Sequence, residues 1–175
     1  MLKAFIPLYA FREITNISHG FLERLGLKFL ILDLDNTIAG YKEPSPPESV
    51  HKWVAELKES GMRFFIVSNS ARKERVGTFS QALGVDEITK ARKPSPDGII
   101  HAMEAAGFTA GESAFIGDQV FTDMIAANRA GIVSIIVKPR RLTNPFHTLR
   151  YTLEAPFRAM CKNRFDCNFQ NDFHQ

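Results

Sequence analysis

The stretch FLILDLDNT, residues 29–37, joins a short and entirely apolar run to two aspartates spaced i, i+2. A run this short and apolar is typical of a strand that is buried on both faces. Similar runs occur at residues 64–67, 114–116 and 133–137. The sequence therefore predicts four buried strands. Three of them are followed by a polar side chain: Asp33, Ser68 and Asp118.

Helical patterns separate these apolar runs. They are expected over residues 45–61, 72–83, 95–107 and 122–130. The first begins with a capping box that has prolines in its first turn, SPPE at 45–48. In the third, Ile99, Ile100 and Met103 are expected on the buried face. Alternating strands and helices predict the α/β fold class, a parallel sheet with helices on both faces.

This topology points to one functional edge of the sheet. In open α/β sheets, ligands bind beyond the carboxyl ends of the strands. Asp33, Ser68 and Asp118 are expected at that edge. An edge rich in aspartate suits a hard cation with oxygen ligands.

Composition limits the class of protein. The 175 residues are 45% hydrophobic and 23% charged, which excludes a disordered chain and fits one domain over residues 1–175. Within it we expect a core at 29–137, a helical segment at 1–28 and a basic extension at 138–175. Two cysteines, Cys161 and Cys167, exclude a disulfide scaffold and make a zinc site unlikely on spacing. No apolar run reaches the ~20 residues of a membrane span and no secretory signal is evident, so a cytoplasmic location is expected.

Charge is unevenly distributed along the chain. The net charge of +3 divides into +2 over residues 1–29, −3 over 30–137 and +4 over 138–175. The basic and aromatic residues of the last segment could dock on an anionic membrane, or their charges could simply be solvated. The apolar residues of the first segment could likewise meet a membrane or form a helix packed in the core. Nucleic acid is disfavoured as a partner because no binding motif is present.

Asp33 and Asp35 are candidates for catalysis. Two carboxylates at this spacing can face one crevice where the chain turns, so that one attacks an electrophile while the other transfers protons. Like charges held close raise one of the two pKa values, which gives a carboxyl group that can act as an acid near neutral pH. The plainer alternative is a solvated loop that happens to hold two aspartates.

Ser68-Asn69-Ser70 and Lys93 are candidates for binding phosphate. A hydroxyl and backbone N–H groups at a strand-to-helix turn can hold phosphate oxygens, unless the segment is an ordinary helix cap. Lys93 precedes a helix that begins with proline and could neutralise a phosphoryl group, although most lysines are solvated surface residues.

Asp118 and Asp123 are candidates for binding a metal. Gly117 permits a close approach of the backbone before Asp118, and Asp123 follows about one helical turn later. The pair could complete a Mg²⁺ site. Alternatively, Asp123 only favours a helix N-terminus electrostatically.

In this order, the four segments resemble the four motifs of the haloacid dehalogenase-like (HAD) phosphohydrolase superfamily. The resemblance rests on DLDNT at 33–37, VSNS at 67–70, the lysine of RKPSPDG at 92–98 and GDQVFTD at 117–123. It covers about residues 29–137. It implies a Rossmann-like parallel sheet, phosphatase activity and Mg²⁺ as cofactor.

The resemblance also implies roles in the chemistry. Asp33 would be the nucleophile that forms an aspartyl-phosphate, and Asp35 would protonate the leaving group and then activate water. Ser68, Asn69 and Lys93 would bind the phosphoryl group.

Further roles concern the metal. Asp33, Asp118 and the backbone carbonyl of Asp35 would coordinate Mg²⁺, and Asp123 would support the metal site. Thr37 would brace the loop of the nucleophile.

Many members of this superfamily insert a cap domain, for which residues 38–44 and 71–92 leave no room here. The sequence resembles capless members that act on bulky substrates, and among them the YqeG-like group of subclass IIIA. That group is related to phosphatases of phosphatidylglycerophosphate, a membrane lipid precursor. A membrane-borne phosphomonoester is therefore the expected substrate. The alternatives are a soluble phosphoprotein, sugar phosphate or nucleotide, and a regulatory module that carries a phosphoaspartate without turnover.

Overall fold

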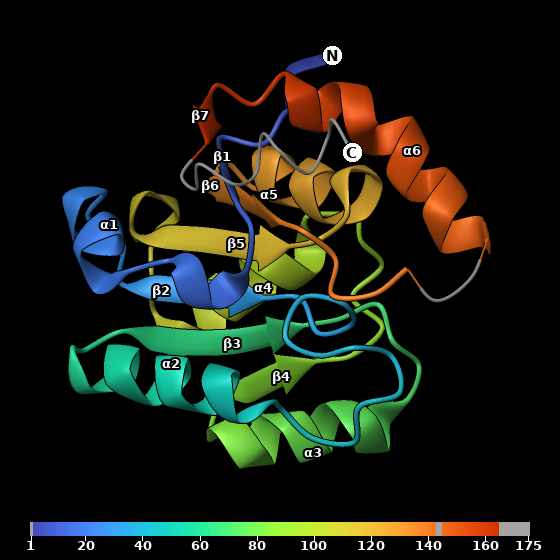
Figure 1. Ribbon diagram of the computed structural model, residues 1–175. Coiled ribbons are helices and arrows are strands. Elements are labelled where there is room, and N and C mark those ends of the chain that lie inside the picture. The colour runs from blue at the N-terminus through green and yellow to red at the C-terminus, as the bar shows by residue number, and fades with distance from the viewer. Residues whose placement is uncertain (1, 143–144, 165–175) are drawn as a thin grey trace.

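The computed structural model describes residues 2–142 and 145–164. Within them, seven strands form one parallel sheet in the order β4-β3-β2-β5-β6-β1-β7, as Figure 1 shows. The strands are β1 (Tyr9–Phe11), β2 (Phe29–Leu32), β3 (Arg63–Val67), β4 (Asp86–Ile88), β5 (Ser113–Gly117), β6 (Val133–Val137) and β7 (Asn163–Arg164). The parallel α/β sheet predicted from the sequence is confirmed.

The helices between the strands vary in length. The α-helices are α1 (His19–Arg24), α2 (Glu48–Glu59), α3 (Lys73–Leu83), α4 (Asp97–Ala106), α5 (Ile125–Arg129) and α6 (Pro145–Ala159). Short 3₁₀ turns form η1 (Leu2–Phe5), η2 (Ile14–Asn16) and η3 (Ala110–Glu112), and a π-helical turn forms η4 (Val120–Met124).

β2 lies at the centre of the sheet, between β3 and β5, and all four of its residues are buried. Successive side chains of a strand point to opposite faces. Leu30 and Leu32 therefore join the core on one face, and Phe29 and Ile31 join the core on the other. Burial on both faces explains why this strand consists of an uninterrupted apolar run.

Helices cover both faces of the sheet. α1, α2 and α3 pack on the face that holds Leu30, where Trp53 of α2 donates a hydrogen bond from its indole nitrogen to the carbonyl oxygen of Ile17 at 2.8 Å. α4 and α5 pack on the opposite face through residues such as Ile99 and Ala126. The two helical layers cover the faces of the sheet but not the carboxyl ends of its central strands, and the loops that follow these strands lie at that edge.

Two local predictions about helices were wrong. α2 has Pro47 at its N-cap and no side-chain capping bond, because a proline side chain offers no acceptor and displaces Ser45 from the capping position. In α4, Ile100 is 37% exposed. The buried stripe of α4 includes Gly98 and Ala102, and a Cβ at residue 98 would lie only 3.0 Å from the Cβ of Ala91. This close packing centres the helix on its small residues and leaves Ile100 at the margin.

The segment 1–28, expected to be helical, contains η1, η2 and α1 but also contributes β1 to the sheet. β1 pairs with β6 and β7, and the N–H of Leu8 donates to the carbonyl oxygen of Ser134 at 3.1 Å. The apolar residues of η2 and α1, with Ile17 between them, are buried. Their role is therefore core packing, the alternative that does not involve a membrane.

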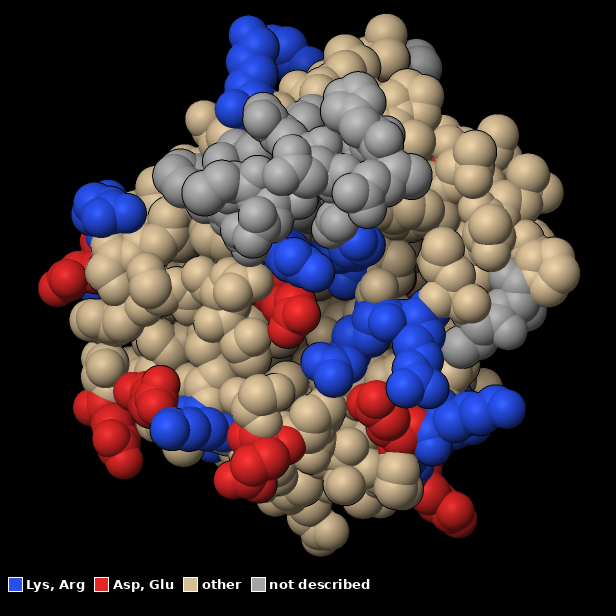
Figure 2. Space-filling model, viewed as in Figure 1, with Lys and Arg blue, Asp and Glu red and all other residues tan. Residues whose placement is uncertain are grey.

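The basic segment that follows β6 folds into α6 and β7 as far as the structure describes it. Cys161 is buried, whereas Cys167 lies outside the described residues. The surface over α6, at the upper right of Figure 2, is mostly tan. None of the helices within the described ranges is long and apolar enough to cross a bilayer.

Candidate active site

The loop after β2 turns two carboxylates toward the carboxyl edge of the sheet. Asp33 follows the last residue of β2 directly. Asn36 adopts the left-handed conformation with φ 67°, and its N–H donates to the carbonyl oxygen of Ala39 at 2.7 Å. This tight turn keeps Asp35 beside the same crevice. Thr37 donates from its hydroxyl to Oδ2 of Asp33 at 3.4 Å, a contact that fits the expected bracing of the loop.

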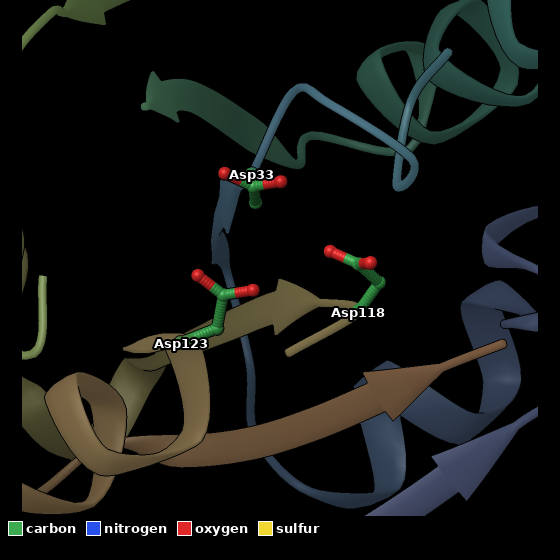
Figure 3. Close-up of side chains that lie close together, drawn as sticks. All are labelled: Asp33, Asp118 and Asp123. Carbon is green, nitrogen blue, oxygen red and sulfur yellow. The ribbon is translucent and has the colours of Figure 1, made fainter. Parts of the chain in front are cut away.

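Asp33, Asp118 and Asp123 form a buried cluster of three carboxylates. One oxygen atom from each lies within 4.8 Å of the others, and Figure 3 shows the three groups turned toward a common space beyond β2 and β5. Asp118 follows β5 directly, and Asp123 belongs to η4. A Cβ at residue 117 would lie 2.5 Å from Oδ2 of Asp123. Gly117 is therefore required for this close approach.

Lys93 is buried against this cluster. Its Nζ lies 2.6 Å from Oδ1 of Asp33 and 2.8 Å from Oδ1 of Asp123, and it donates to the carbonyl oxygen of Val67 at 2.9 Å. Asn69 fixes the backbone of Lys93 at both ends. Its Oδ1 accepts from the N–H of Lys93 at 2.8 Å, and its Nδ2 donates to the carbonyl oxygen at 2.9 Å. The side chain of Asn69 thus positions Lys93 and has both polar atoms engaged.

The electrostatics of the cluster favour an additional cation. Burial raises the pKa of Asp33 to about 7, although Lys93 lowers it. Burial also raises the pKa of Asp118, and the neighbouring Asp123 and Asp33 raise it further. The same two neighbours raise the pKa of Lys93 against the effect of its own burial, so Lys93 is an ammonium. Three carboxylates around one ammonium leave an excess of buried negative charge when all of them are ionised.

The donor set fits a hard divalent cation. Oδ1 of Asp118 is buried and has no hydrogen-bond partner within residues 2–142 and 145–164, which is unusual for a carboxylate oxygen. Carboxylate oxygens are the ligands that Mg²⁺ prefers. The unsatisfied oxygen and the excess of negative charge are both features that a bound cation would relieve.

An open cavity of about 210 Å³ lies beside the cluster. Its lining includes Asp33, Asp35 and Ser68, which follow β2 and β3. Oγ of Ser68 accepts a hydrogen bond from the N–H of Ser70 at 3.1 Å. The cavity is large enough for a phosphoryl group, and it brings together the nucleophile and acid–base candidates with Ser68.

Two arginines of the next helix had no place in the sequence-based prediction. Arg75 of α3 donates to Oδ1 of Asp35 from Nε at 3.3 Å and from Nη2 at 3.2 Å. It also donates to the carbonyl oxygens of Gly40 and Glu43. Nη2 of Arg72 lies 3.5 Å from the same carboxylate oxygen. Arg72 is the N-cap of α3 and Arg75 lies in its first turn. Their spacing, i and i+3 at the start of the helix after VSNS, is the signal that could have identified them.

α6 supplies a further support that sequence reasoning missed. Oε1 of Glu154 accepts from the N–H of Phe121 at 3.0 Å, and its Oε2 accepts from Nη2 of Arg158 at 2.6 Å. The same nitrogen donates to the carbonyl oxygen of Asp118 at 2.6 Å. A buried ion pair of α6 thus contacts the loop that carries two of the three clustered carboxylates.

Comparisons with known proteins agree with this geometry. A sequence model of the haloacid dehalogenase-like hydrolases matches residues 10–131. The probable phosphatase YqeG of Bacillus subtilis (strain 168) is 34% identical over 146 residues, which cover 83% of this chain and 84% of YqeG. Phosphatidylglycerophosphate phosphatase 1, chloroplastic/mitochondrial, of Arabidopsis thaliana is 25% identical over 158 residues, which cover 81% of this chain and 43% of the plant protein.

A similar fold is found among solved structures. The 3-deoxy-D-manno-octulosonate 8-phosphate phosphatase of Moraxella catarrhalis, in complex with a magnesium ion, a phosphate ion and KDO, superposes with a TM-score of 0.51 at 14% identity. The match covers 90% of this chain and 98% of that protein.

Proposed function

Since the chain belongs to the haloacid dehalogenase-like hydrolases and is a phosphatase, we propose that it hydrolyses phosphomonoesters with Mg²⁺ through an aspartyl-phosphate on Asp33. The observation that carries the proposal is the buried cluster of Asp33, Asp118 and Asp123 around Lys93. Asp33 of this cluster also lines the cavity that Asp35 lines. Phosphoryl transfer depends chiefly on positioning and charge stabilisation, and this cluster offers both.

The proposed steps use groups of this chain. A carboxylate oxygen of Asp33 attacks phosphorus while the bond to the leaving oxygen breaks, and Asp35 gives that oxygen its proton. Asp35 then takes a proton from water, and the resulting hydroxide attacks phosphorus and frees Asp33 and inorganic phosphate. Ser68 and Lys93 hold the phosphoryl oxygens in both steps.

Mg²⁺ would be held by Asp33, Asp118 and the backbone carbonyl of Asp35, with Asp123 in support. When bound, the ion supplies positive charge against the oxygens of the transferring group. Asn69 acts by fixing the backbone of Lys93, and Thr37 by bracing Asp33. The magnesium named with the Moraxella catarrhalis phosphatase supports the choice of this ion.

The substrate that we propose is a membrane-borne phosphomonoester, with phosphatidylglycerophosphate as the candidate. The plant relative is named for this activity, and the open crevice has no cap domain to exclude a bulky substrate. The proposal treats residues 1–175 as one unit with its catalytic core at 29–137. It further places the protein in the cytoplasm, at the surface of the membrane.

Phosphate release from a panel of monoesters tests this proposal. The panel contains phosphatidylglycerophosphate in mixed micelles, sugar phosphates, nucleotides, a phosphopeptide and p-nitrophenyl phosphate, each with Mg²⁺ or with EDTA. We expect Mg²⁺-dependent release from the lipid and a loss of at least about a thousandfold in Asp33→Asn. Release from soluble monoesters alone would overturn the lipid assignment. A stable phosphoprotein without release would identify the regulatory module instead.

A further inference from the structure

α6 turns three charged or polar side chains to the protein, together with the ring of Phe157, and turns most of its large apolar side chains to solvent. Its buried residues are His147, Glu154 and Arg158. Its exposed large apolar residues are Phe146 (69% exposed), Leu149 (58%) and Leu153 (56%), followed by Met160 (48%) just beyond its end. A helix on the surface of a protein in water normally has the opposite arrangement. The outer face of α6 is therefore suited to an apolar environment.

The contacts of the inner face fix this orientation. The bonds of Glu154 to the N–H of Phe121 and of Arg158 to the carbonyl oxygen of Asp118 hold the helix against the catalytic loop. The ring of His147 stacks on Tyr41 at 5.0 Å between centroids. A rotation that buried the leucines would break these contacts and leave a buried ion pair unsatisfied. The exposed apolar row, spaced i, i+3, i+7, is thus a constant feature of the folded chain.

Charge along the segment that carries the helix is mostly basic. Between residues 138 and 164 the sequence contains a single acidic residue, Glu154, and it is buried. Arg140 and Arg141 are exposed just before α6, and Lys162 is exposed just after it. Arg140 and Arg141 also line a cavity of about 360 Å³ in which four basic residues, with Lys138 and Arg12, outnumber the acidic Glu13 and Glu43. Nε of Arg140 lies 3.8 Å from Oε2 of Glu43, so Arg141 and Lys162 are the exposed basic residues beside α6 with no acidic partner among the described ion pairs. An apolar row with basic residues at both ends is complementary to a layer that has an apolar interior and anionic groups at its surface.

We propose that the outer face of α6, defined by Phe146, Leu149, Leu153 and Met160, is a docking surface for an anionic lipid bilayer. The apolar side chains enter the interface, while Arg140, Arg141 and Lys162 meet anionic headgroups. The inference rests on the proposed function and deepens it, because it identifies the physical source of the substrate.

The position of α6 joins docking to catalysis. In Figure 1 its first turn lies on the side toward which the arrow of β5 points, the edge that carries the active site. His147 of α6 stacks on Tyr41, which lines the crevice. Arg158 of α6 bonds to the backbone of Asp118, which belongs to the carboxylate cluster. A bilayer seated on the outer face therefore lies beside the cavity, where a phosphomonoester headgroup can enter without leaving the membrane.

Flotation with lipid vesicles tests the surface. The full chain is mixed with vesicles of phosphatidylcholine, alone or with 30% phosphatidylglycerol as a probe of about physiological charge. We expect binding to the anionic vesicles and at least a tenfold weaker partition for the double variant Leu149→Ser, Leu153→Ser. The matched control is Ile100→Ser, which removes an exposed apolar side chain from α4. It should bind like the parent. Because all three positions are exposed, unchanged thermal melting checks that the variants fold.

Two further measurements separate this inference from the proposed function. Hydrolysis of soluble p-nitrophenyl phosphate should be the same in the double variant and the parent, while hydrolysis of phosphatidylglycerophosphate in vesicles should fall with binding. A parent protein that releases phosphate but does not float with anionic vesicles overturns the docking surface alone. Vesicle binding through α6 without phosphate release overturns the proposed function alone. A dimer in sedimentation that dissociates in the double variant, without vesicle binding, shows that a second copy covers this face.

Discussion

Gly117 permits the cluster of three carboxylates because it lacks a side chain. In the Gly117→Ala variant the new Cβ would lie 2.5 Å from Oδ2 of Asp123, so Asp123 has to move away from Lys93 and Asp118. A displacement of about 1 Å at a catalytic centre can cost about a hundredfold. We expect a tenfold to hundredfold loss of phosphatase activity and a higher Mg²⁺ concentration at half-maximal rate, measured by phosphate release.

The matched control is Gly111→Ala, because no atom lies within 4 Å of a Cβ at that position. It should keep the activity of the parent. If Gly117→Ala also kept the Mg²⁺ dependence of the parent, the tight contact with Asp123 would have no part in binding the metal.

Arg75 positions Asp35 through two hydrogen bonds to one carboxylate oxygen. In Arg75→Gln the carboxylate of Asp35 loses the two hydrogen bonds from the guanidinium. We expect kcat to fall about tenfold to a hundredfold on alkyl phosphates, because their leaving oxygen needs a proton from Asp35. p-Nitrophenyl phosphate, whose leaving group needs little protonation, should be affected several-fold less. Rates on the two substrates provide the measurement.

Arg63→Gln is the control, since Arg63 is exposed at the start of β3, the opposite end from the active site. Equal losses on both substrates in Arg75→Gln would indicate a general structural defect instead of a role through Asp35.

Much of the candidate site could be predicted from the sequence because its residues follow strands. Asp33, Ser68 and Asp118 come directly after β2, β3 and β5, and these strands are neighbours in the sheet. Parallel neighbours end at one edge, so local patterns were enough to place the three together. Arg75 and Glu154 contact the site from helices, over 40 and 33 residues of sequence. No local pattern encodes such a distance.

Among the elements, strands with apolar runs were predictable, and the three-residue strands β4 and β1 were not. β2, β3, β5 and β6 are mostly buried in the sheet, and each carries at least three consecutive apolar residues. β4 has the sequence Asp-Glu-Ile and is mostly exposed at one edge, so its pairing with β3 leaves no hydrophobic signal. β1 has three residues and depends on β6 far along the chain. The sequence predicted only a basic extension where α6 lies. The burial of its charged residues Glu154 and Arg158 and the exposure of its apolar residues depend on tertiary contacts, which a local pattern does not encode.

The ion pair of α6 predicts a large effect on stability. Glu154→Ala removes the carboxylate that accepts from Arg158 and Phe121 and leaves the buried guanidinium without it. Breaking a buried pair in this way costs about 3–5 kcal/mol. We expect the free energy of unfolding, measured by urea denaturation, to fall by that amount.

Thr152→Ala serves as a control on the same helix, because Thr152 is exposed and its hydroxyl donates to the carbonyl oxygen of Thr148 in the preceding turn of α6. Its effect should stay within about 0.5 kcal/mol. A loss in Glu154→Ala no larger than this would mean that the pair contributes little to the fold.

At the scale of the whole molecule, the buried carboxylates make stability depend on pH. The pKa of Asp33 is about 7 in the folded chain without metal, against 3.8 as its ordinary value, chiefly because of burial. Between these values the folded chain binds a proton that the unfolded chain has lost, so the free energy of unfolding decreases as pH rises. Urea denaturation in EDTA at pH 5 to 8 should show this decrease, and Mg²⁺ should restore more stability at pH 8 than at pH 5.

Asp33→Asn provides the comparison, since the amide does not titrate. His147 acts in the opposite direction, because burial lowers its pKa and stability from that source increases with pH. The histidine is present in both proteins, so the difference between their pH profiles isolates the carboxylate. Parallel profiles would show that Asp33 ionises as freely in the folded chain as in the unfolded one.

The placement of β1 between β6 and β7 has a consequence for how the protein is made. A ribosome delivers the chain from its N-terminus, so Tyr9–Phe11 emerges more than a hundred residues before its partners Ile135, Ile136 and Val137. Until then its hydrogen-bonding groups have no neighbouring strand, and an unpaired strand of this kind invites association with other chains. The strands β2 to β5 can assemble from nearby segments while synthesis continues. The pairing of β1 therefore joins an early segment of the nascent chain to a much later one, and β1 is open to association with other chains until β6 has been made.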